Sequence, residues 1–565
     1  MRRGAPLVLL CGGLLSACNA IFGITEANPT SSATGTGDSM SSASGTSGTG
    51  GSGGLATTST TGPTTSTTTS TSTSSTGGAA PVCDGSGPTG PVGNTPIFAK
   101  QSSGQYSNEE ATAVAIGPDG SVYAIGLYSS GDVFFNGTSL PYDTGDGSNV
   151  FVVKRHPDGL SDWAVGFKGP LEQEPLGLAL DDSGHLYVAG RMEGSMKLGA
   201  MTTLTATGLD GFVAQLDAAT GAVGWAKRFG GPGDDMIQQV AYDGKKHIVL
   251  AGMTNGVIDF GCAAPIDTVP VGVFLVELDA AGNCVWQHEY NANTRFTDKD
   301  NIGLPVALAV DRSTPGAIYL AGGADSPNFG QGQITGLGQK DVFVFKATSN
   351  GDYVNAKIFG ALFPSDGLQY ATSVAVDPCG DVLLTGAFNH DLTFGLLPTL
   401  HTVNQNKDAG FMDVDDEDMF LAKLDSSLKP IWAKSFGDSG LQRGASVAVD
   451  AFSNVTVGGA LIQRPYSVGI DFGGGVLKGV GPDSYGDYLA DVVVARYDAS
   501  GKYQWAQRYG TVGGQGLGGV AVDDKGHTAF AGWFVSDNIG PLMIGPNVDT
   551  LLASGQDAFF IRLGP

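Results

Sequence analysis

Aspartate and glycine recur together along the chain at a spacing that suits a cation site. The tetrapeptides are Gly117–Gly120, Asp181–Gly184, Asp377–Gly380 and Asp523–Gly526. Clustered carboxylates are calcium ligands, but none of these has EF-hand spacing or a terminal bidentate glutamate. Asp and Gly also satisfy backbone groups and tolerate positive φ in hairpins, so we predict turns. The acidic run Asp413–Asp418 precedes a strand within a long loop and predicts a solvated charge run.

Two further motifs resemble known sequence motifs, one of a catalytic nucleophile and one of a docking site. Gly437–Gly440 reads GDSG and resembles the nucleophile stretch of trypsin-like proteases, but no matching histidine motif occurs among the 7 histidines. Asp217–Trp225 is similar to the DxxTGxxxW docking motif of quinoprotein dehydrogenase propellers and of propeller lipoproteins that assist outer-membrane assembly. Other repeats lack its threonine, which favours convergent turn chemistry. We predict no catalytic, cofactor-binding or metal-binding residue.

A repeated pattern of strands must position any such site. The second strand of the pattern ends in glycine seven times, at positions 62 to 73 residues apart: Gly126, Gly190, Gly252, Gly322, Gly386, Gly459 and Gly532. A strand, a polar turn and another strand follow in each repeat. The last of these strands carries a tryptophan at Trp163, Trp225, Trp286, Trp432 and Trp505, with Asn355 replacing it in the fourth repeat. A tryptophan at one repeat position predicts packing between neighbouring sheets.

The two ends of the repeat region complement each other. The seventh repeat stops at its third strand, and Pro96–Lys100 matches the missing fourth strand, with Phe98 at the tryptophan position. An N-terminal strand that completes the last sheet leaves no unpaired edge. The sequence therefore predicts an all-β fold, a seven-bladed β-propeller of four-stranded blades over residues 92–565, whose last blade is closed by the N-terminal strand.

The repeats resemble those of the bacterial β-propeller repeat proteins of the SBBP type. The recurring patterns AVDxxGxVYVAG and DxFVAKLDxxGxxxWAKxFG carry the resemblance, which covers residues 92–565. Asn355 and the absent last strand of the seventh repeat depart from the pattern. The resemblance implies a propeller in an exported or surface protein and does not imply a particular activity.

The N-terminus reads as an export signal. Arg2 and Arg3 precede a short apolar stretch, and Leu15–Cys18 resembles a lipobox, which implies cleavage after residue 17 and lipidation of Cys18. An ordinary cleaved secretory signal is the alternative, whereas the apolar run is too short for a membrane-spanning helix. Residues 18–91, rich in Ser, Thr and Gly, predict a flexible, disordered tether, with O-linked sugars as an open alternative. We expect the acyl chains to be the membrane attachment, in the outer membrane.

Cysteine content and charge restrict partners and chemistry further. Apart from Cys11 and Cys18, four cysteines remain, and an exported chain permits disulfides. Cys262 and Cys284 belong to one repeat and are the predicted bridge, while pairing of Cys83 with Cys379 is left open. A net charge of −25 repels phosphate backbones, so nucleic acid is an improbable partner. We expect a monomer.

Three functions fit the sequence. The first is a non-enzymatic binding or scaffolding lipoprotein of the cell envelope that presents its loops to a protein or glycan; no site stands apart from the repeat pattern. The second is a polysaccharide hydrolase or lyase whose site lies at the channel mouth and is built from several blades. The third is an outer-membrane assembly factor.

Overall fold

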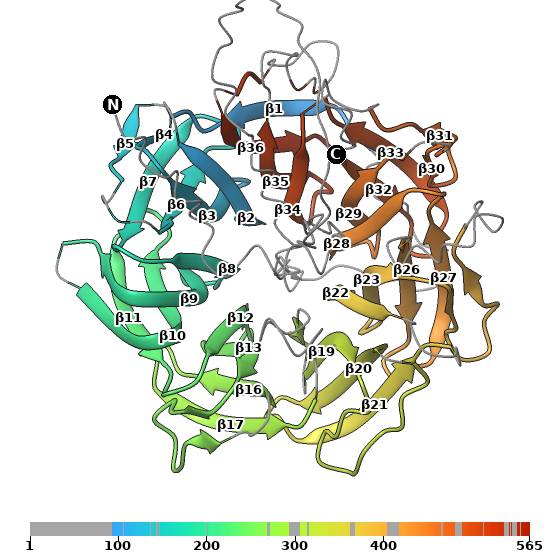
Figure 1. Cartoon of the computed structure of the whole chain (residues 1–565), viewed down its shortest axis with the longest axis horizontal. Coiled ribbons are helices and arrows are strands. Elements are labelled where there is room, and N and C mark those ends of the chain that lie inside the picture. The colour runs from blue at the N-terminus through green and yellow to red at the C-terminus, as the bar shows by residue number, and fades with distance from the viewer. Residues whose placement is uncertain are drawn as a thin grey trace, which may run out of the picture.

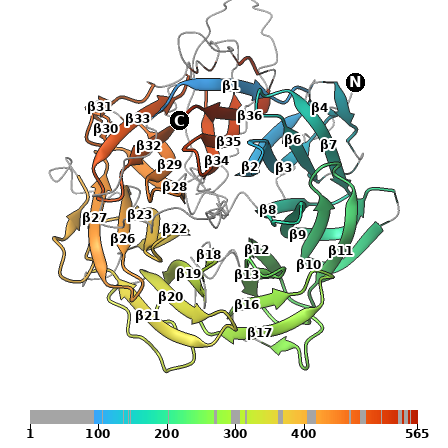
Figure 2. The ribbon, with the colours of Figure 1, turned by 180° about the vertical axis from the view of Figure 1, so that it is seen from behind.

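The computed structural model describes residues 93–565 apart from 105–106, 136, 143–144, 146, 201, 268–271, 293–305, 314–315, 339, 362–367, 404–416, 465–466, 481–488, 512, 536–541, 543, 545–550 and 554. The predicted signal (1–17), Cys18 and the tether (18–91) lie outside this range. The described residues form β-strands and no α-helix, and so contain no helical segment with the length and apolar character of a membrane span. The strands are arranged around a ring, which gives an all-β, propeller-like fold (Figures 1 and 2).

Antiparallel groups of four strands repeat along the chain, and we call them units 1 to 7 in the order of the sequence repeats. Units 3 to 6 are separate four-stranded sheets. Unit 3 consists of β12 (Asp235–Tyr242), β13 (Ile248–Thr254), β16 (Gly272–Leu278) and β17 (Cys284–Tyr290), and unit 4 of β18 (Ala307–Asp311), β19 (Ala317–Ala324), β20 (Asp341–Thr348) and β21 (Tyr353–Phe359). Unit 5 consists of β22 (Gln369–Val376), β23 (Val382–Phe388), β26 (Asp418–Leu424) and β27 (Pro430–Phe436), and unit 6 of β28 (Leu441–Val449), β29 (Val455–Ile462), β32 (Ala490–Tyr497) and β33 (Tyr503–Tyr509).

Units 1, 2 and 7 belong to one 12-stranded sheet. Unit 1 consists of β2 (Asn108–Ile116), β3 (Val122–Ser129), β6 (Asn149–Arg155) and β7 (Ser161–Lys168), and unit 2 of β8 (Gln173–Leu180), β9 (His185–Leu198), β10 (Thr202–Asp217) and β11 (Val223–Phe229). Unit 7 consists of β34 (Gln515–Val522), β35 (Thr528–Val535), β36 (Gln556–Leu563) and β1 (Pro96–Gln101). Short ladders join the three groups, between β7 and β9 and between β2 and β36. The first strand of each group lies toward the middle of the ring (Figures 1 and 2).

The N-terminal strand takes the place predicted from the repeats. β1 pairs antiparallel with β36, with Phe98 opposite Arg562 and Gln101 opposite Phe559. Phe98 is buried, and a Cβ added to Gly159 of unit 1 would lie 2.6 Å from its ring, so Phe98 packs against the next unit. β1 thereby serves as the fourth strand of unit 7.

The repeated tryptophans pack between units, as predicted. A glycine at positive φ in the turn of the following unit lies against the ring in several cases: Gly221 against Trp163, Gly282 against Trp225 and Gly501 against Trp432. Trp225 Nε1 also donates to the carbonyl of Ala280, at 3.0 Å. In unit 4 the shorter Asn355 donates to Ser427 O, and Leu428, also at positive φ, stands in that turn in place of glycine.

Aromatic side chains in the loops between the second and third strands pack against the sheets and anchor these loops. Four of them contain two-stranded sheets: β4 (Val133–Phe135) with β5 (Thr138–Leu140), β14 (Val257–Ile258) with β15 (Ile266–Asp267), β24 (Asp391–Leu392) with β25 (Leu400–His401), and β30 (Ile470–Asp471) with β31 (Val476–Leu477). In unit 3 the buried Phe260 ring lies 4.9 Å from that of Phe229 and 5.0 Å from that of Phe274. Phe394 and Phe472 make the corresponding contacts in units 5 and 6, and each of the three phenylalanines is followed by glycine in the sequence, so these residues anchor the loops.

The recurring glycine lies within the second strand rather than at its predicted end, because the strand continues past it, and in six of the seven units it faces a bulge in the first strand. In unit 5 the register shifts between Ala371 and Ser373, and a Cβ added to Gly386 would lie 2.0 Å from the carbonyl oxygen of Tyr370. The same shift and the same close approach occur in units 1, 2, 3, 6 and 7. The recurring glycine is therefore required by packing.

We expect Gly386→Ala to destabilise the protein by about 3 kcal/mol, because the added methyl group has no space beside the Tyr370 carbonyl and the strand must move. Gly208→Ala is the matched control, because the added Cβ would lie 3.5 Å from the nearest atom. We expect this variant to change the free energy of unfolding by less than about 0.5 kcal/mol. Urea unfolding of both variants measures the difference. Equal midpoints for the two variants would rule out the packing explanation.

Candidate functional site

The structure joins Cys262 and Cys284 by a disulfide, the pair predicted from the sequence, with their Cα atoms 5.4 Å apart. Cys284 begins β17 and Cys262 lies between β14 and β15, so the bridge ties this loop of unit 3 to the fourth strand. The predicted lipidation site, Cys18, lies outside the described residues.

The recurring Asp-Gly motifs form turns. In unit 2, Asp181 Oδ1 accepts hydrogen bonds from the backbone N–H groups of Ser183 and His185, each at 2.8 Å. Asp377 and Asp523 make the same two bonds to the residues two and four positions later. One carboxylate oxygen of each aspartate is thus engaged by its own turn, which agrees with the turn prediction.

The GDSG stretch shows no catalytic arrangement. Asp438 is buried and accepts hydrogen bonds from the N–H groups of Gly440, at 2.7 Å, and Gly469, at 2.6 Å, so it holds two loop segments together. Ser439 Oγ is buried and has no hydrogen-bond partner among the described residues, so no base is placed to activate it. In the DxxTGxxxW stretch, Thr220 Oγ1 donates to Asp217 Oδ1 within the turn, at 2.7 Å.

The end of the acidic run differs from the prediction of a solvated stretch. Residues 413–416 lie outside the described residues, but Glu417 and Asp418 are buried. Arg443 Nε donates to Glu417 Oε2, and Tyr370 Oη donates to the same oxygen at 3.1 Å. Burial is possible because an arginine neutralises the Glu417 carboxylate.

One position near the end of each third strand lies opposite the same position of the second strand, and in units 3, 5, 6 and 7 it contacts a side chain in the turn between the first two strands. It carries a cation in five units, glutamine in unit 2 and glutamate in unit 3: Lys154, Gln215, Glu277, Lys346, Lys423, Arg496 and Arg562. Lys423 Nζ lies 2.8 Å from Asp377 Oδ2, and Arg496 forms an ion pair with Asp450. We call these contacts the strand–turn pairs.

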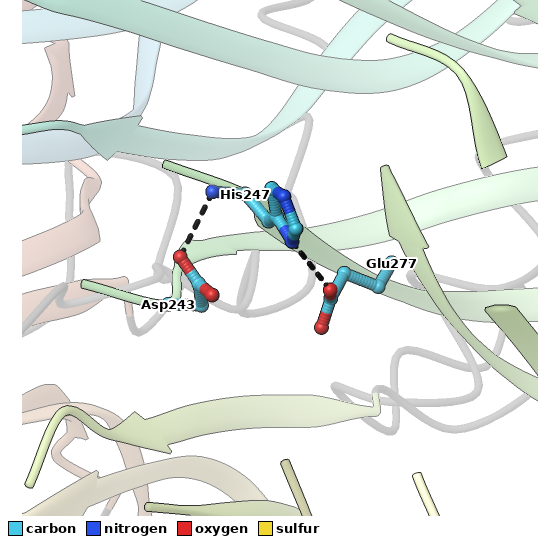
Figure 3. Close-up of side chains that lie close together, drawn as sticks. All are labelled: Asp243, His247 and Glu277. Carbon is cyan, nitrogen blue, oxygen red and sulfur yellow. Dashed lines mark hydrogen bonds and ion pairs between the residues drawn. The ribbon is translucent and has the colours of Figure 1, made fainter. Parts of the chain in front are cut away.

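Unit 3 reverses the charge of its strand–turn pair, as Figure 3 shows. Glu277 Oε1 lies 2.6 Å from His247 Nδ1, and Asp243 Oδ1 accepts from the His247 backbone N–H at 2.9 Å. Trp286 Nε1 donates to the other oxygen of Glu277 at 3.0 Å. Burial raises the pKa of Glu277, an effect that the nearby His247 partly offsets. Asp243, His247 and Glu277 together offer three metal-ligand atoms within 4.8 Å of one another.

A groove of about 820 Å³ lies where units 1 and 2 meet. β9 and β10 are 14 and 16 residues long, and the hairpin they form extends to pair with β7. The groove is lined by Tyr142, Val165, Gly166, Phe167, Lys168, Lys197, Leu198, Gly199, Ala200, Thr202, Thr220, Gly221, Ala222 and Val223. None of these lining residues is Asp, Glu, His, Cys or Ser, so the described lining offers neither a carboxylate nor an imidazole.

Two lysines face each other in this groove. Lys168 of β7 and Lys197 of β9 are direct cross-strand partners, and both line the groove. Neither forms an ion pair with a described residue. Like charges at directly opposite positions destabilise a sheet. In a chain with a net charge of −25, such a pair defines a local positive site that suits an anionic ligand.

The sequence contained a signal for one of these two sites. Alignment of the third strands places Glu277 where five other repeats carry Lys or Arg, so the charge reversal is visible in the repeats. The lysine pair has no such signal, because it depends on how far the unit 2 hairpin extends and on its register with β7.

No model of a known protein family matches the chain. No curated protein matches it in sequence. Among solved structures, it is similar to quinohemoprotein alcohol dehydrogenase from Comamonas testosteroni, with 13% identity, a TM-score of 0.37 and coverage of 81% of this chain and 76% of that one. A subtype N10 neuraminidase-like protein of A/little yellow-shouldered bat/Guatemala/060/2010 gives 8% identity, a TM-score of 0.31 and coverage of 83% and 98%. We draw no functional conclusion from similarities of this size.

Proposed function

We propose that this chain is an exported, lipid-anchored seven-bladed β-propeller that binds an anionic ligand at the cell envelope without transforming it. Units 1 to 7 are its four-stranded blades, and β1 closes the ring. A signal over residues 1–17, a lipid on Cys18 and a tether to residue 91 place the propeller at the outer membrane. Membership of the SBBP-type repeat proteins remains part of this proposal.

The pairing of Lys168 with Lys197 carries the proposal. A bound anion relieves the repulsion between the two ammonium groups, so the groove gains more from an anionic ligand than a neutral surface does. Tyr142, Thr202 and Thr220 add an aromatic ring and two hydroxyl groups to the groove wall. Ammonium, hydroxyl and aromatic groups suit an acidic polysaccharide, which is the ligand class we favour.

The described lining of the groove is compatible with binding and lacks the residues of a hydrolase. Hydrolysis or elimination on a polysaccharide requires a general acid and a general base within reach of the scissile bond. The described lining residues supply neither a carboxylate nor an imidazole. The described lining therefore lacks the carboxylate pair of a glycoside hydrolase, which favours binding over hydrolysis, whereas elimination, for which lysine and tyrosine can act as base and acid, is distinguished by the experiment below.

Binding of polygalacturonate, with uncharged dextran as the matched probe, tests this proposal on the purified protein. We expect Lys168→Gln/Lys197→Gln to weaken polygalacturonate binding at least tenfold, and added salt to weaken binding by the wild type. Thermal stability should be unchanged or higher in the double variant, since a like-charge pair has been removed.

Lys502→Gln serves as the control, because Lys502 is an exposed lysine in the turn between β32 and β33 of unit 6. Binding that is equal in the double variant and in the control would remove the groove from the proposal. Shortening of the polysaccharide by the wild type would instead establish an enzyme.

A further inference from the structure

We propose that Asp243, His247 and Glu277 of unit 3 form a binding site for a divalent transition-metal ion such as Zn²⁺. Asp243 and His247 lie in the turn between β12 and β13, and Glu277 lies near the end of β16 (Figure 3). The site is separate from the groove of the proposed function, so the two proposals are tested independently.

The charge of this site differs from that of the equivalent place in the other units. Five units carry a Lys or Arg at this third-strand position, which pairs with the turn aspartate in units 5, 6 and 7, and unit 2 carries Gln215. Unit 3 keeps the turn aspartate, Asp243, and adds the buried carboxylate of Glu277. A cation bound between these two carboxylates and the imidazole offsets the negative charge that unit 3 places at a position where most units carry a Lys or Arg.

Two other units show what a histidine does at this turn position without the added carboxylate. His185 Nδ1 lies 2.7 Å from Asp181 Oδ2, and His527 Nδ1 lies 2.7 Å from Asp523 Oδ2. Each of these rings contacts the aspartate of its own turn. In unit 3 the ring contacts Glu277 across the sheet instead, which brings groups from two separate segments to one point.

The three side chains are held in a way that suits coordination. Zinc bound at about 2.0–2.1 Å in tetrahedral geometry places ligand atoms roughly 3.3 Å apart, which small rotations of these side chains reach. Trp286 Nε1 orients Glu277, and the turn N–H groups orient Asp243, as outer partners of a metal site do. The His247 side chain is 34% exposed, so an ion has access and a water molecule completes the coordination.

Zinc titration of the chelator-treated full-length protein tests the site. We expect isothermal titration calorimetry and elemental analysis to show a bound zinc ion in the wild type that raises its Tm. His247→Gln and Glu277→Lys should each weaken zinc binding at least tenfold, and Glu277→Lys restores the cation that five other units carry. Circular dichroism checks that both variants are folded.

His185→Gln and His527→Gln are the matched controls, because they remove a histidine from the same turn position in units 2 and 7. Both should retain the zinc affinity of the wild type. Absence of zinc uptake by the wild type would overturn the proposal. Uptake that survives in folded Glu277→Lys would overturn it as well, because the ion would then lie elsewhere.

Discussion

Deletion of residues 92–104 is expected to destabilise the protein by at least about 5 kcal/mol and to make it self-associate. The deletion removes the buried Phe98 and Ala99 together with the ladder between β1 and β36, and both apolar burial and backbone pairing are lost. It also exposes β36 as an unpaired edge, which pairs readily with other chains. Thermal unfolding and size-exclusion chromatography of the purified variant measure the two effects.

Deletion of residues 28–81 is the control for chain shortening, because this Ser/Thr/Gly-rich stretch of the predicted tether has no apolar pattern with which to stabilise a fold. We expect it to leave the unfolding midpoint of the propeller unchanged. An unchanged midpoint after deletion of residues 92–104 would show that β1 does not close the ring.

Arg496→Met should be the most damaging change among the strand–turn pairs. Arg496 and Asp450 are both fully buried, and burial lowers the pKa of Arg496 while Asp450 opposes that shift. Removing the guanidinium leaves the Asp450 carboxylate buried without a counter-charge, which costs about 3–5 kcal/mol. Chemical unfolding monitored by tryptophan fluorescence measures this loss.

Lys346→Met tests the same position in unit 4 where no carboxylate depends on the cation. Lys346 Nζ donates to the Ser426 carbonyl at an exposed site, so this variant should lose less than about 1 kcal/mol. Adding Asp450→Asn to Arg496→Met should recover part of the stability, because it removes the unpaired charge. Equal losses in Arg496→Met and Lys346→Met would show that the buried pair contributes nothing beyond packing.

The sequence predicted the parts of the fold that repeat. The glycine of each second strand and the tryptophan of the fourth recur because a bulge or a neighbouring unit faces them in nearly every unit, so the same packing constraint applies each time. The partner of β1 was predictable as well, since Phe98 continues the tryptophan series.

Features that occur once were harder to predict. The long hairpin of unit 2 brings Lys197 to Lys168 across a unit boundary, and linear spacing carries no information on that pairing. Glu417 reads as part of a charge run, but Arg443, which neutralises it, lies 26 positions further along the chain. In unit 3, Glu277 is likewise separated from Asp243 and His247 by the whole of β13 and its following loop.

Residence at the envelope through a lipid on Cys18 is the central claim, because the proposed ligand is met only outside the cytoplasm. Cell fractionation with protease treatment of intact cells, comparing the wild type with Cys18→Ala, tests it most directly. We predict that the wild type sediments with the outer membrane and that Cys18→Ala is released in soluble form. A Cys18→Ala protein that stays in the membrane fraction like the wild type would contradict the lipid anchor.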